Sequence, residues 1–379
     1  MRILHGSAID LLSNTGITGY TLPSVLEQKY LNLISGKTRG PLAAAARGVL
    51  GLAELPYSLA MRKRNQRYDA GGTYFLNRPT ISIGNITAGG TGKTPVVQWL
   101  ADQLEQTGHH PAILMRGYRK TGSQASDEQT VLADSLPGIP VEANPDRIAA
   151  AAFVLRGYPQ TSCFLLDDGF QHRRVHRNFD LVLINAAEPF GFGHVHPRGL
   201  LREPLCGLKR ASAILITHAS EVSPEALLQT QDTIRQHTSA PIFHADHVNT
   251  CIVSADNRTT RELSDLATIP FMLFTGIGQP QPLCASLKRF ASAYKTEYLF
   301  DDHHHYSPAD ISTLEVVRQL SRAQILLTTE KDWAKLKPIW PPDNPYLYRL
   351  QLSIRFWESE QDPFLHMISK SLLPKAKGT

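Results

Sequence analysis

The chain has 379 residues, which at ordinary domain sizes of roughly 100 to 200 residues predicts two folded units. Its hydrophobic share of 42% and charged share of 19% exclude an intrinsically disordered protein, because the chain has enough apolar surface to form a core. The net charge is +5, but no run of Lys and Arg reaches the length of a nucleic-acid-binding arm. An acidic substrate or an anionic membrane explains this bias as well as nucleic acid does, and no nucleic-acid partner is expected.

The first 61 residues show no secretory signal, because no clean apolar run with a cleavage site follows Met1 and Arg2. Residues 41–61, PLAAAARGVLGLAELPYSLAM, are rich in Ala and Leu but contain Arg47, Glu54 and Pro56. A spanning helix needs about 20 predominantly apolar residues, so this segment is predicted to lie in the membrane interface rather than to cross it. The basic residues 62–64, RKR, are then expected to meet lipid headgroups. The alternative is an amphipathic helix packed on its own protein.

Short β-rich runs then alternate with helical stretches, which favours a doubly wound parallel sheet of the α/β class. A helix is predicted around residues 96–104, with Val96, Val97, Leu100 and Leu104 on one face. A second, smaller α/β unit begins near His247 and has a helical region at residues 282–293. The predicted strands are residues 80–84, 112–115, 163–167, 181–185, 213–217, 271–274 and 324–328.

We therefore divide the chain into four parts. Residues 1–66 form an N-terminal membrane-associating helical segment, residues 67–246 a P-loop ATP-binding domain, residues 247–369 a smaller α/β domain and residues 370–379 a tail. The four cysteines are far apart and form no CxxC pair, which argues against a zinc or redox motif and for free thiols in the cytoplasm. They are Cys163, Cys206, Cys251 and Cys284.

Residues 81–94, ISIGNITAGGTGKT, run from an apolar strand through a glycine-rich turn into a helix. Such a turn presents backbone N–H groups to phosphate, and the helix adds its positive end. Lys93 is expected to reach the β and γ phosphates, and the Thr94 hydroxyl to bind Mg²⁺. Thr87 stands where the usual GxxxxGK[ST] pattern begins with Gly, and an ordinary turn is the alternative. The predicted ATP-binding residues are Thr87, Ala88, Gly89, Gly90, Thr91, Gly92, Lys93 and Thr94.

Two adjacent carboxylates, Asp167 and Asp168, lie at the end of the predicted strand CFLLD, Asp167 as its last residue and Asp168 directly after it. Adjacent acids repel one another unless a cation lies between them, so both are assigned to the magnesium region without a choice of direct ligand. A solvated turn after the strand is the alternative, because DDG is also a good turn sequence.

Several long, separate motifs resemble those of the tetraacyldisaccharide 4'-kinase family, the lipid A 4'-kinases, in family order over residues 40–350. The resemblance implies transfer of the ATP γ-phosphate, with Mg²⁺, to the 4'-hydroxyl of a tetraacyldisaccharide 1-phosphate at the cytoplasmic face of a bacterial inner membrane. It also implies two P-loop-like α/β domains, and no obligate protein partner is evident. The motifs are GNITAGGTGKTP, RGY, SDE, LLDDGFQHRR, LLREP, TGIGQP, DDHHHY and TTEKDW.

The resemblance also implies a catalytic pair made of an Asp after RGY and a His from the second domain, which match Asp127 and His303. An Asp that accepts the hydroxyl proton with help from an imidazole suits phosphoryl transfer to an alcohol. His304 is the second choice, because three histidines follow one another here. A metal site in this Asp and His cluster is the alternative.

Glu203 matches an acid that the family places near magnesium, and Arg202 beside it is a candidate phosphate contact. Arg116 and Arg119 follow the next predicted strand and are further candidates. A surface or structural ion pair remains equally possible for each arginine.

Two other classes of function compete with a kinase. A P-loop GTPase or metallochaperone shares the glycine loop and strand-end Asp, but guanine selection usually needs an [NT]KxD turn. The corresponding strand here ends in Thr217, His218, Ala219 and Ser220. A nucleotide-gated membrane adaptor needs the loop but neither Asp127 nor His303.

Overall fold

The structure is a computed structural model that describes residues 25–89, 91–117, 127–278, 280–302 and 304–373. Its contacts divide the chain into two compact units. The larger comprises residues 32–250 and 352–373, and the smaller comprises residues 251–351 with the described residues before Asn32. Strands β7 (Ile242–Ser254) and β12 (Leu347–Phe356) each begin in one unit and end in the other.

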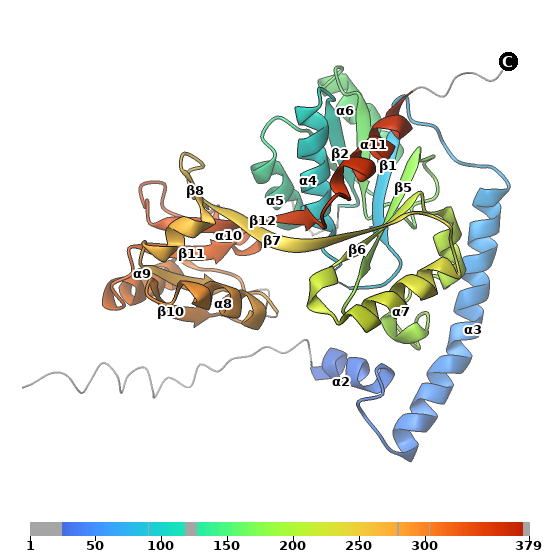
Figure 1. Cartoon of the computed structure of the whole chain (residues 1–379), viewed down its shortest axis with the longest axis horizontal. Coiled ribbons are helices and arrows are strands. Elements are labelled where there is room, and N and C mark those ends of the chain that lie inside the picture. Colours follow the sequence, from blue (N-terminus) through green and yellow to red (C-terminus); the bar gives the residue numbers. More distant parts are fainter. Residues whose placement is uncertain (1–24, 90, 118–126, 279, 303, 374–379) are drawn as a thin grey trace, which may run out of the picture. The chain divides into compact units, whose positions relative to one another are not determined.

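The larger unit is a parallel sheet in the order β7-β6-β5-β1-β4-β2-β3. Because β1 is followed by strands on one side and later by strands on the other, its carboxyl end lies where the strand order reverses, a usual place for ligands. Figure 1 shows α4 and α6 beside this sheet. The elements are α3 (Pro41–Asp69), β1 (Thr80–Asn85), α4 (Lys93–Gln106), β2 (Pro111–Met115), α5 (Asp127–Ser135), β3 (Val141–Ala143), α6 (Arg147–Gly157), β4 (Cys163–Asp167), β5 (Phe179–Asn185), β6 (Ala213–Thr217), α7 (Pro224–Arg235) and α11 (Gln361–Leu372).

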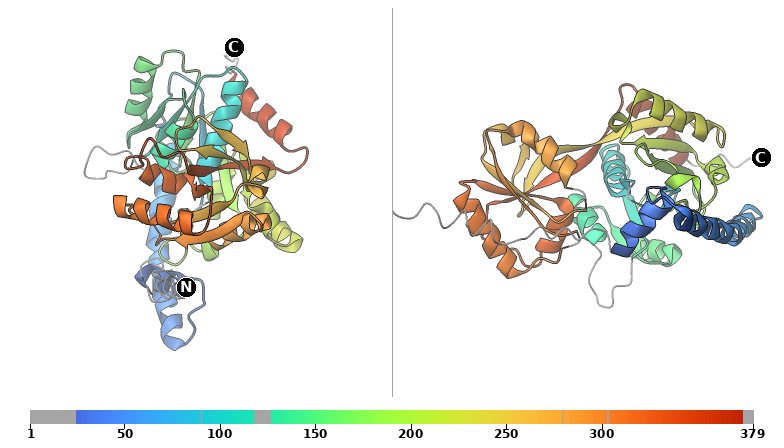
Figure 2. Two further views of the ribbon diagram at one scale, coloured as in Figure 1. Left: turned by 90° about the vertical axis from the view of Figure 1, so that its left-hand side faces the viewer. Right: turned by 90° about the horizontal axis from the view of Figure 1, so that it is seen from below.

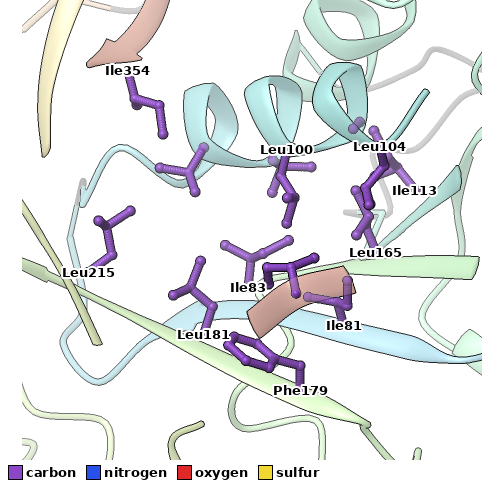
Figure 3. Packing of buried hydrophobic residues seen from close by; sticks show 14 of the residues in the cluster. Ile81, Ile83, Leu100, Leu104, Ile113, Leu165, Phe179, Leu181, Leu215 and Ile354 are labelled. Atoms are coloured by element: carbon purple, nitrogen blue, oxygen red, sulfur yellow. The ribbon is translucent and has the colours of Figure 1, made fainter. Parts of the chain in front are cut away.

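Helix α4 covers β1 with the apolar face that the sequence predicts. Leu100 and Leu104 are buried against Ile81 and Ile83 of β1 and Leu165 of β4 (Figure 3). This packing holds the start of α4, and with it the glycine loop, at the carboxyl end of β1. The sequence interpretation of this helix is confirmed.

The smaller unit has the parallel strand order β10-β9-β11-β12, with the short β8 antiparallel to the end of β7. Ser307 and Asp310 form a capping box that begins α9, and Pro308 occupies its first turn. The elements are β8 (Thr260–Glu262), β9 (Phe271–Thr275), α8 (Gln281–Leu287), β10 (Tyr294–Leu299), α9 (Pro308–Leu320), β11 (Ile325–Thr329) and α10 (Glu330–Leu336). Helix α2 (Val25–Ile34) is divided between the units.

The predicted strands all appear, at or within two residues of their expected bounds, and the predicted alternation of strands and helices is confirmed. The sequence interpretation missed β3, β7, β8, β10 and β12. Strands β3 and β8 have three residues each, and β10 carries polar residues among half-buried ones. None of these three strands has the continuous apolar run that marks a buried strand.

The sequence-based limits of the smaller domain, 247 and 369, differ from the contact-based limits of 251 and 351. The difference arises at the carboxyl end, because α11 packs on the larger unit. Its residues Phe364, Ile368 and Leu372 are buried in the same cluster as Leu100 of α4.

Helix α3 is a long helix that runs along the outside of the larger unit (Figures 1 and 2). It continues through Pro56 to Asp69, beyond the apolar segment that the sequence marks. No helix among the described residues is long and apolar enough to span a membrane. Within the basic cluster 62–64, Arg64 contacts the protein, because its Nη2 donates a hydrogen bond to the Gln171 carbonyl at 2.7 Å. Contact of the cluster with lipid stays a prediction.

Candidate functional site

The glycine loop connects β1 to α4, as the sequence predicts. Gly92 is the residue before α4 and has a left-handed φ of 69°, and a Cβ there would lie 2.1 Å from the His247 ring. Only Gly meets both conditions. Thr87 is buried, and its carbonyl accepts a hydrogen bond from Asn85 Nδ2 at 2.7 Å. Gly90 lies outside the described residues.

Lys93 is the first residue of α4 and points to the ends of two neighbouring strands. Its Nζ lies 3.3 Å from Asn85 Oδ1 of β1 and 3.5 Å from Asp168 Oδ1, which follows β4. The Lys93 side chain is 17% exposed. Thr94, the next residue, is half-buried in the first turn of α4. The structure therefore brings the predicted phosphate-binding lysine and one predicted metal acid together.

Asp168 is held by two cations. Arg202 Nη1 lies 2.8 and 2.9 Å from the two carboxylate oxygens of Asp168, and Lys93 Nζ lies 3.5 Å from one of them. Burial opposes ionisation of Asp168, but Lys93 and Arg202 outweigh it and hold its pKa below the ordinary value. The predicted Arg202 therefore contacts the predicted metal region directly.

Asp167 has a different environment from its neighbour. Burial raises the pKa of Asp167 to about 6, although Lys93 acts in the opposite direction. Its Oδ1 is buried and has no hydrogen-bond partner among the described residues. A buried carboxylate oxygen of this kind suits a cation ligand, because a cation supplies the missing partner.

Arg147 contacts the backbone of Asp167, and the sequence interpretation missed this residue. Its Nη2 donates to the Asp167 carbonyl at 3.3 Å, and its Nη1 donates to the Asn144 carbonyl at 2.8 Å. Burial lowers the pKa of Arg147 to about 10, while Asp167 and Asp168 favour its charged form. Its sequence signal is weak, because it is simply the first residue of α6 after the capping Asp146.

Glu203 is 1% exposed and is surrounded by hydrogen-bond donors. Arg210 Nη2 lies 2.9 Å from both carboxylate oxygens, Gln171 Nε2 lies 3.1 Å from Oε1 and Asn65 Nδ2 lies 3.0 Å from Oε2. Gln171 also donates to the Asn85 carbonyl at 2.9 Å and accepts from Arg202 at 3.3 Å. Glu203 thus connects to the phosphate loop through Gln171.

The remaining predicted residues are less closely defined. Asp127 begins α5, but its side chain is not among those described, and Arg119 and His303 lie outside the described residues. Arg116 follows β2 and is exposed. In the smaller unit, His304 stacks on Phe300 at 4.4 Å.

A buried carboxylate also organises the smaller unit. Asp332 is fully buried, and its Oδ2 accepts hydrogen bonds from Thr275 and Thr329 at 2.6 and 2.7 Å. Its Oδ1 accepts from the Gly276 amide at 3.1 Å and the Tyr306 hydroxyl at 2.9 Å. Asp332 therefore ties the turn after β9 to the segment before α9. Asp332 lies in the TTEKDW motif, to whose individual residues the sequence interpretation assigned no role.

The described residues contain no group of three or more His, Cys, Asp or Glu side chains that would hold a metal by themselves. Mg²⁺ in phosphotransfer enzymes is usually bound by one or two carboxylates together with phosphates and water. Asp167, Asp168 and Thr94 fit such a site, and the phosphates of a nucleotide would supply the other ligands.

Comparison with known proteins identifies the family. The sequence profile of a family described as LpxK, tetraacyldisaccharide-1-P 4'-kinase, matches residues 46–372. The chain belongs to this family. The tetraacyldisaccharide 4'-kinase of Syntrophus aciditrophicus (strain SB) is 33% identical over 361 residues, which cover 88% of this chain and 94% of that protein. The corresponding kinase of Geobacter metallireducens is 34% identical over 310 residues, covering 77% of this chain and 89% of that protein.

A solved LpxK structure agrees with this assignment. The Aquifex aeolicus LpxK crystal structure in complex with ATP has a TM-score of 0.70 and 26% identity, and the match covers 86% of this chain and all of that one. The prediction of a lipid A 4'-kinase is confirmed by the family. The GTPase, metallochaperone and adaptor alternatives find no support in it.

Proposed function

We propose that this LpxK-family chain transfers the γ-phosphate of ATP to the 4'-hydroxyl of a tetraacyldisaccharide 1-phosphate, with the residues of the glycine loop and β4 holding the donor. One observation carries this proposal: Lys93, Asp168 and Arg202 converge at the carboxyl ends of β1 and β4, beside the loop. A cation, a carboxylate and a glycine loop at that point make up the donor side of a phosphotransfer site.

The donor is held by backbone and charge. The amides of the loop bind the phosphates, and Lys93 approaches the β and γ phosphates, which compete with Asp168 for its ammonium. Arg202 then offers its guanidinium to phosphate or remains on Asp168. When bound, Mg²⁺ would neutralise the negative charge that develops on the phosphates during transfer. Thr94, Asp167 and Asp168 are the residues that would hold this ion.

The acceptor side rests on Asp127 and His303. We assign Asp127 to accept the proton of the 4'-hydroxyl as its oxygen forms the new bond to the γ-phosphorus, while the bond from that phosphorus to the β-phosphate oxygen breaks. His303 orients or assists this carboxylate, with His304 as the alternative. The first position of α5 supports Asp127 because it places this residue on a helix of the unit that carries the phosphate loop.

Glu203 acts on the site indirectly in this proposal. Protein donors already occupy both of its carboxylate oxygens. Its effect on the magnesium region is therefore through Gln171, which contacts Asn85 and Arg202. Arg116 and Arg119 are proposed to contact phosphate of the nucleotide or the lipid.

Helix α3 supports a membrane surface as the place of reaction. One side of the helix faces the protein with polar groups: Glu54 accepts from the Val195 amide at 3.0 Å, and Tyr57 donates to the Arg202 carbonyl at 2.8 Å. Its exposed apolar side chains, 61 to 86% exposed, are Leu42, Val49, Leu52, Leu55 and Leu59. We propose that these leucines and the valine lie in the interface of the cytoplasmic leaflet of the inner membrane.

The test is phosphorylation of detergent-dispersed tetraacyldisaccharide 1-phosphate by γ-labelled ATP and Mg²⁺. We expect label on the lipid with unsubstituted protein and a loss of about 100-fold or more in kcat for Asp127→Asn. The control is Glu105→Gln, which also replaces a carboxylate by its amide but at an exposed position near the carboxyl end of α4. ATP hydrolysis without labelled lipid would overturn the acceptor, and full activity of Asp127→Asn would overturn the base.

A further inference from the structure

Two stacked histidines lie where the pairing of β6 with β7 ends, and neither the glycine loop nor the acceptor chemistry assigns a role to them. The rings of His218 and His247 have centroids 4.4 Å apart and planes 29° from parallel. His218 follows β6, and His247 lies within β7. Strand β6 is parallel to β5 and β1, and its last residue, Thr217, pairs with Ala245 of β7. His218 and His247 therefore lie at the same edge of the sheet as the glycine loop after β1.

His247 fixes this pair to the glycine loop. Its Nε2 lies 3.2 Å from the Gly92 carbonyl, so Nε2 is the donor and carries the proton. Burial lowers the pKa of His247 to about 4, which keeps the ring neutral at pH 7. The Thr217 hydroxyl, at the end of β6, also donates to the Thr91 carbonyl at 3.3 Å. The end of β6 and His247 of β7 thus both contact the loop directly.

His218 is the outer ring of the pair. One of its faces lies on His247, and its Nδ1 is 2.6 Å from Glu221 Oε1, so the ring has a fixed orientation. A quarter of the side chain remains exposed. Its backbone is left-handed, with φ of 57°, a region that is uncommon for residues other than Gly but that His, like Asn and Asp, enters more often than most. His218 therefore presents an oriented, partly exposed aromatic ring close to the glycine loop.

The distance from the glycine loop suits the base of a nucleotide. Strand β6 is separated from β1 only by β5, so it lies about 10 Å away at the usual strand spacing of about 4.8 Å. In the proposed function the γ-phosphate lies near Asp168, which is on the β4 side of β1, and near the Lys93 ammonium that reaches it. A nucleoside triphosphate with its γ-phosphate there reaches His218 if its base extends toward β5 and β6.

The neighbouring carboxylate is not available to select guanine. Asp246 accepts hydrogen bonds from the Ser220 amide at 2.8 Å, the Ser220 hydroxyl at 2.5 Å and Trp357 Nε1 at 3.2 Å. An acid that reads guanine must accept the donors on the base edge, and Asp246 would have to give up these partners to do so.

We propose that His218 is the stacking platform for the adenine base of the nucleotide, and that His247 is the layer that joins this platform to the glycine loop. The proposal rests on the proposed function, because it requires a nucleoside triphosphate at that loop. Aromatic stacking gives affinity without reading the base edge. The ring face of His218 therefore contributes to the affinity for the nucleotide by stacking on its base. Adenine can bind there because this stacking does not require a carboxylate that selects guanine.

The experiment compares two ligands that share three phosphates, ATP and inorganic tripolyphosphate. Binding of each, with Mg²⁺ and without lipid acceptor, is measured by calorimetry on the full chain in detergent. His218→Asn removes the ring at a residue type that tolerates left-handed φ, and His218→Phe restores an aromatic face. His110→Ala is the control, because His110 is exposed and lies at the amino end of β2, whereas the glycine loop lies at the carboxyl ends of the strands.

We expect His218→Asn to weaken ATP binding about tenfold, or about 1.4 kcal/mol, and tripolyphosphate binding less than about twofold. His218→Phe should bind ATP within about threefold of the unsubstituted protein. Unchanged ATP binding in His218→Asn, equal weakening of both ligands, or tighter binding of GTP than of ATP would overturn the proposal. If the unsubstituted protein binds neither ligand, the phosphate site itself fails, whereas failure to label lipid with ATP binding intact affects only the acceptor assignment.

Discussion

Lys93 Nζ lies 3.5 Å from Asp168 Oδ1, so the cation of the glycine loop and the acid at the end of β4 form one pair. Arg202 binds the same carboxylate at 2.8 Å. These charges come from three separate segments, and their attraction keeps them at one point of the sheet edge. Phosphate entering the loop would compete with Asp168 for both cations.

Replacing Lys93 should therefore affect transfer more than folding. We expect Lys93→Met to lower kcat for lipid phosphorylation by about 100- to 1000-fold, because a positioned charge on the transferring phosphate is lost. Lys209→Met, at an exposed lysine, should retain activity. The measurement is the label on the lipid at saturating ATP, and a kcat for Lys93→Met within a factor of a few of the unsubstituted protein would contradict the assignment.

Glu203→Gln should reduce stability. The substitution leaves Arg210, whose side chain is 11% exposed, without its carboxylate, and removal of one partner from such a buried pair costs about 3 kcal/mol. Urea unfolding at pH 7 measures the free energy of unfolding, with Glu105→Gln as the exposed control. Superimposable unfolding curves for Glu203→Gln and the unsubstituted protein would show that the network contributes little.

The buried His247 should make stability depend on pH. Its pKa is lowered by burial and by His218, against Glu221 and Asp246, to about 4 from an ordinary 6.5. As pH falls from 6.5 toward 4, the unfolded chain takes up a proton that the folded chain does not, so stability is lost. Between pH 7 and about pH 5, protonation of this residue in the unfolded chain should lower the free energy of unfolding by about 2 kcal/mol.

His247→Gln should remove this part of the pH dependence. The free energy of unfolding is measured at both pH values, and the difference between them should be smaller in the variant by about 2 kcal/mol. His110→Ala, at an exposed histidine, should behave as the unsubstituted protein does. An equal pH dependence in His247→Gln would show that His247 is not the residue responsible.

The apolar side of α3 should govern membrane binding. Leu52→Glu with Leu59→Glu places charge at positions 70% and 65% exposed, so folding should be unaffected. Cosedimentation with anionic vesicles should fall by about tenfold or more, because each leucine loses about 1.5 to 3 kcal/mol of burial. Leu228→Glu, on α7 and 56% exposed, tests whether any exposed leucine has this effect. Equal loss in that control would argue against α3 as the binding surface.

Asp332→Ala should destabilise the smaller unit. It leaves the donors of Thr275, Tyr306, Thr329 and the Gly276 amide without their buried acceptor. We expect a loss of about 3 kcal/mol or more in the free energy of unfolding, since unsatisfied buried donors each cost about 1 to 3 kcal/mol. Asp343→Ala, at an exposed loop position, is the comparison. An unchanged unfolding midpoint for Asp332→Ala would exclude this role.

The sequence alone determined seven of the described strands, the glycine loop and the two acids at the end of β4. Continuous apolar runs mark strands buried on both faces, and GGTGKT specifies a backbone shape that few other residues can adopt. The motifs also gave the family, which the comparisons confirm. Short or half-polar strands such as β8 and β10 were missed because nothing in their local pattern separates them from loops.

Tertiary structure alone decided which side chains meet. Glu203 was predicted beside magnesium, but its contact with Asn65 of α3 depends on how that helix packs on the rest of the larger unit. The stacking of His218 on His247 likewise requires the pairing of β6 with β7. Sequence patterns report local backbone preference and burial, whereas these contacts join residues far apart in the chain, whose distance is set only when the sheet forms.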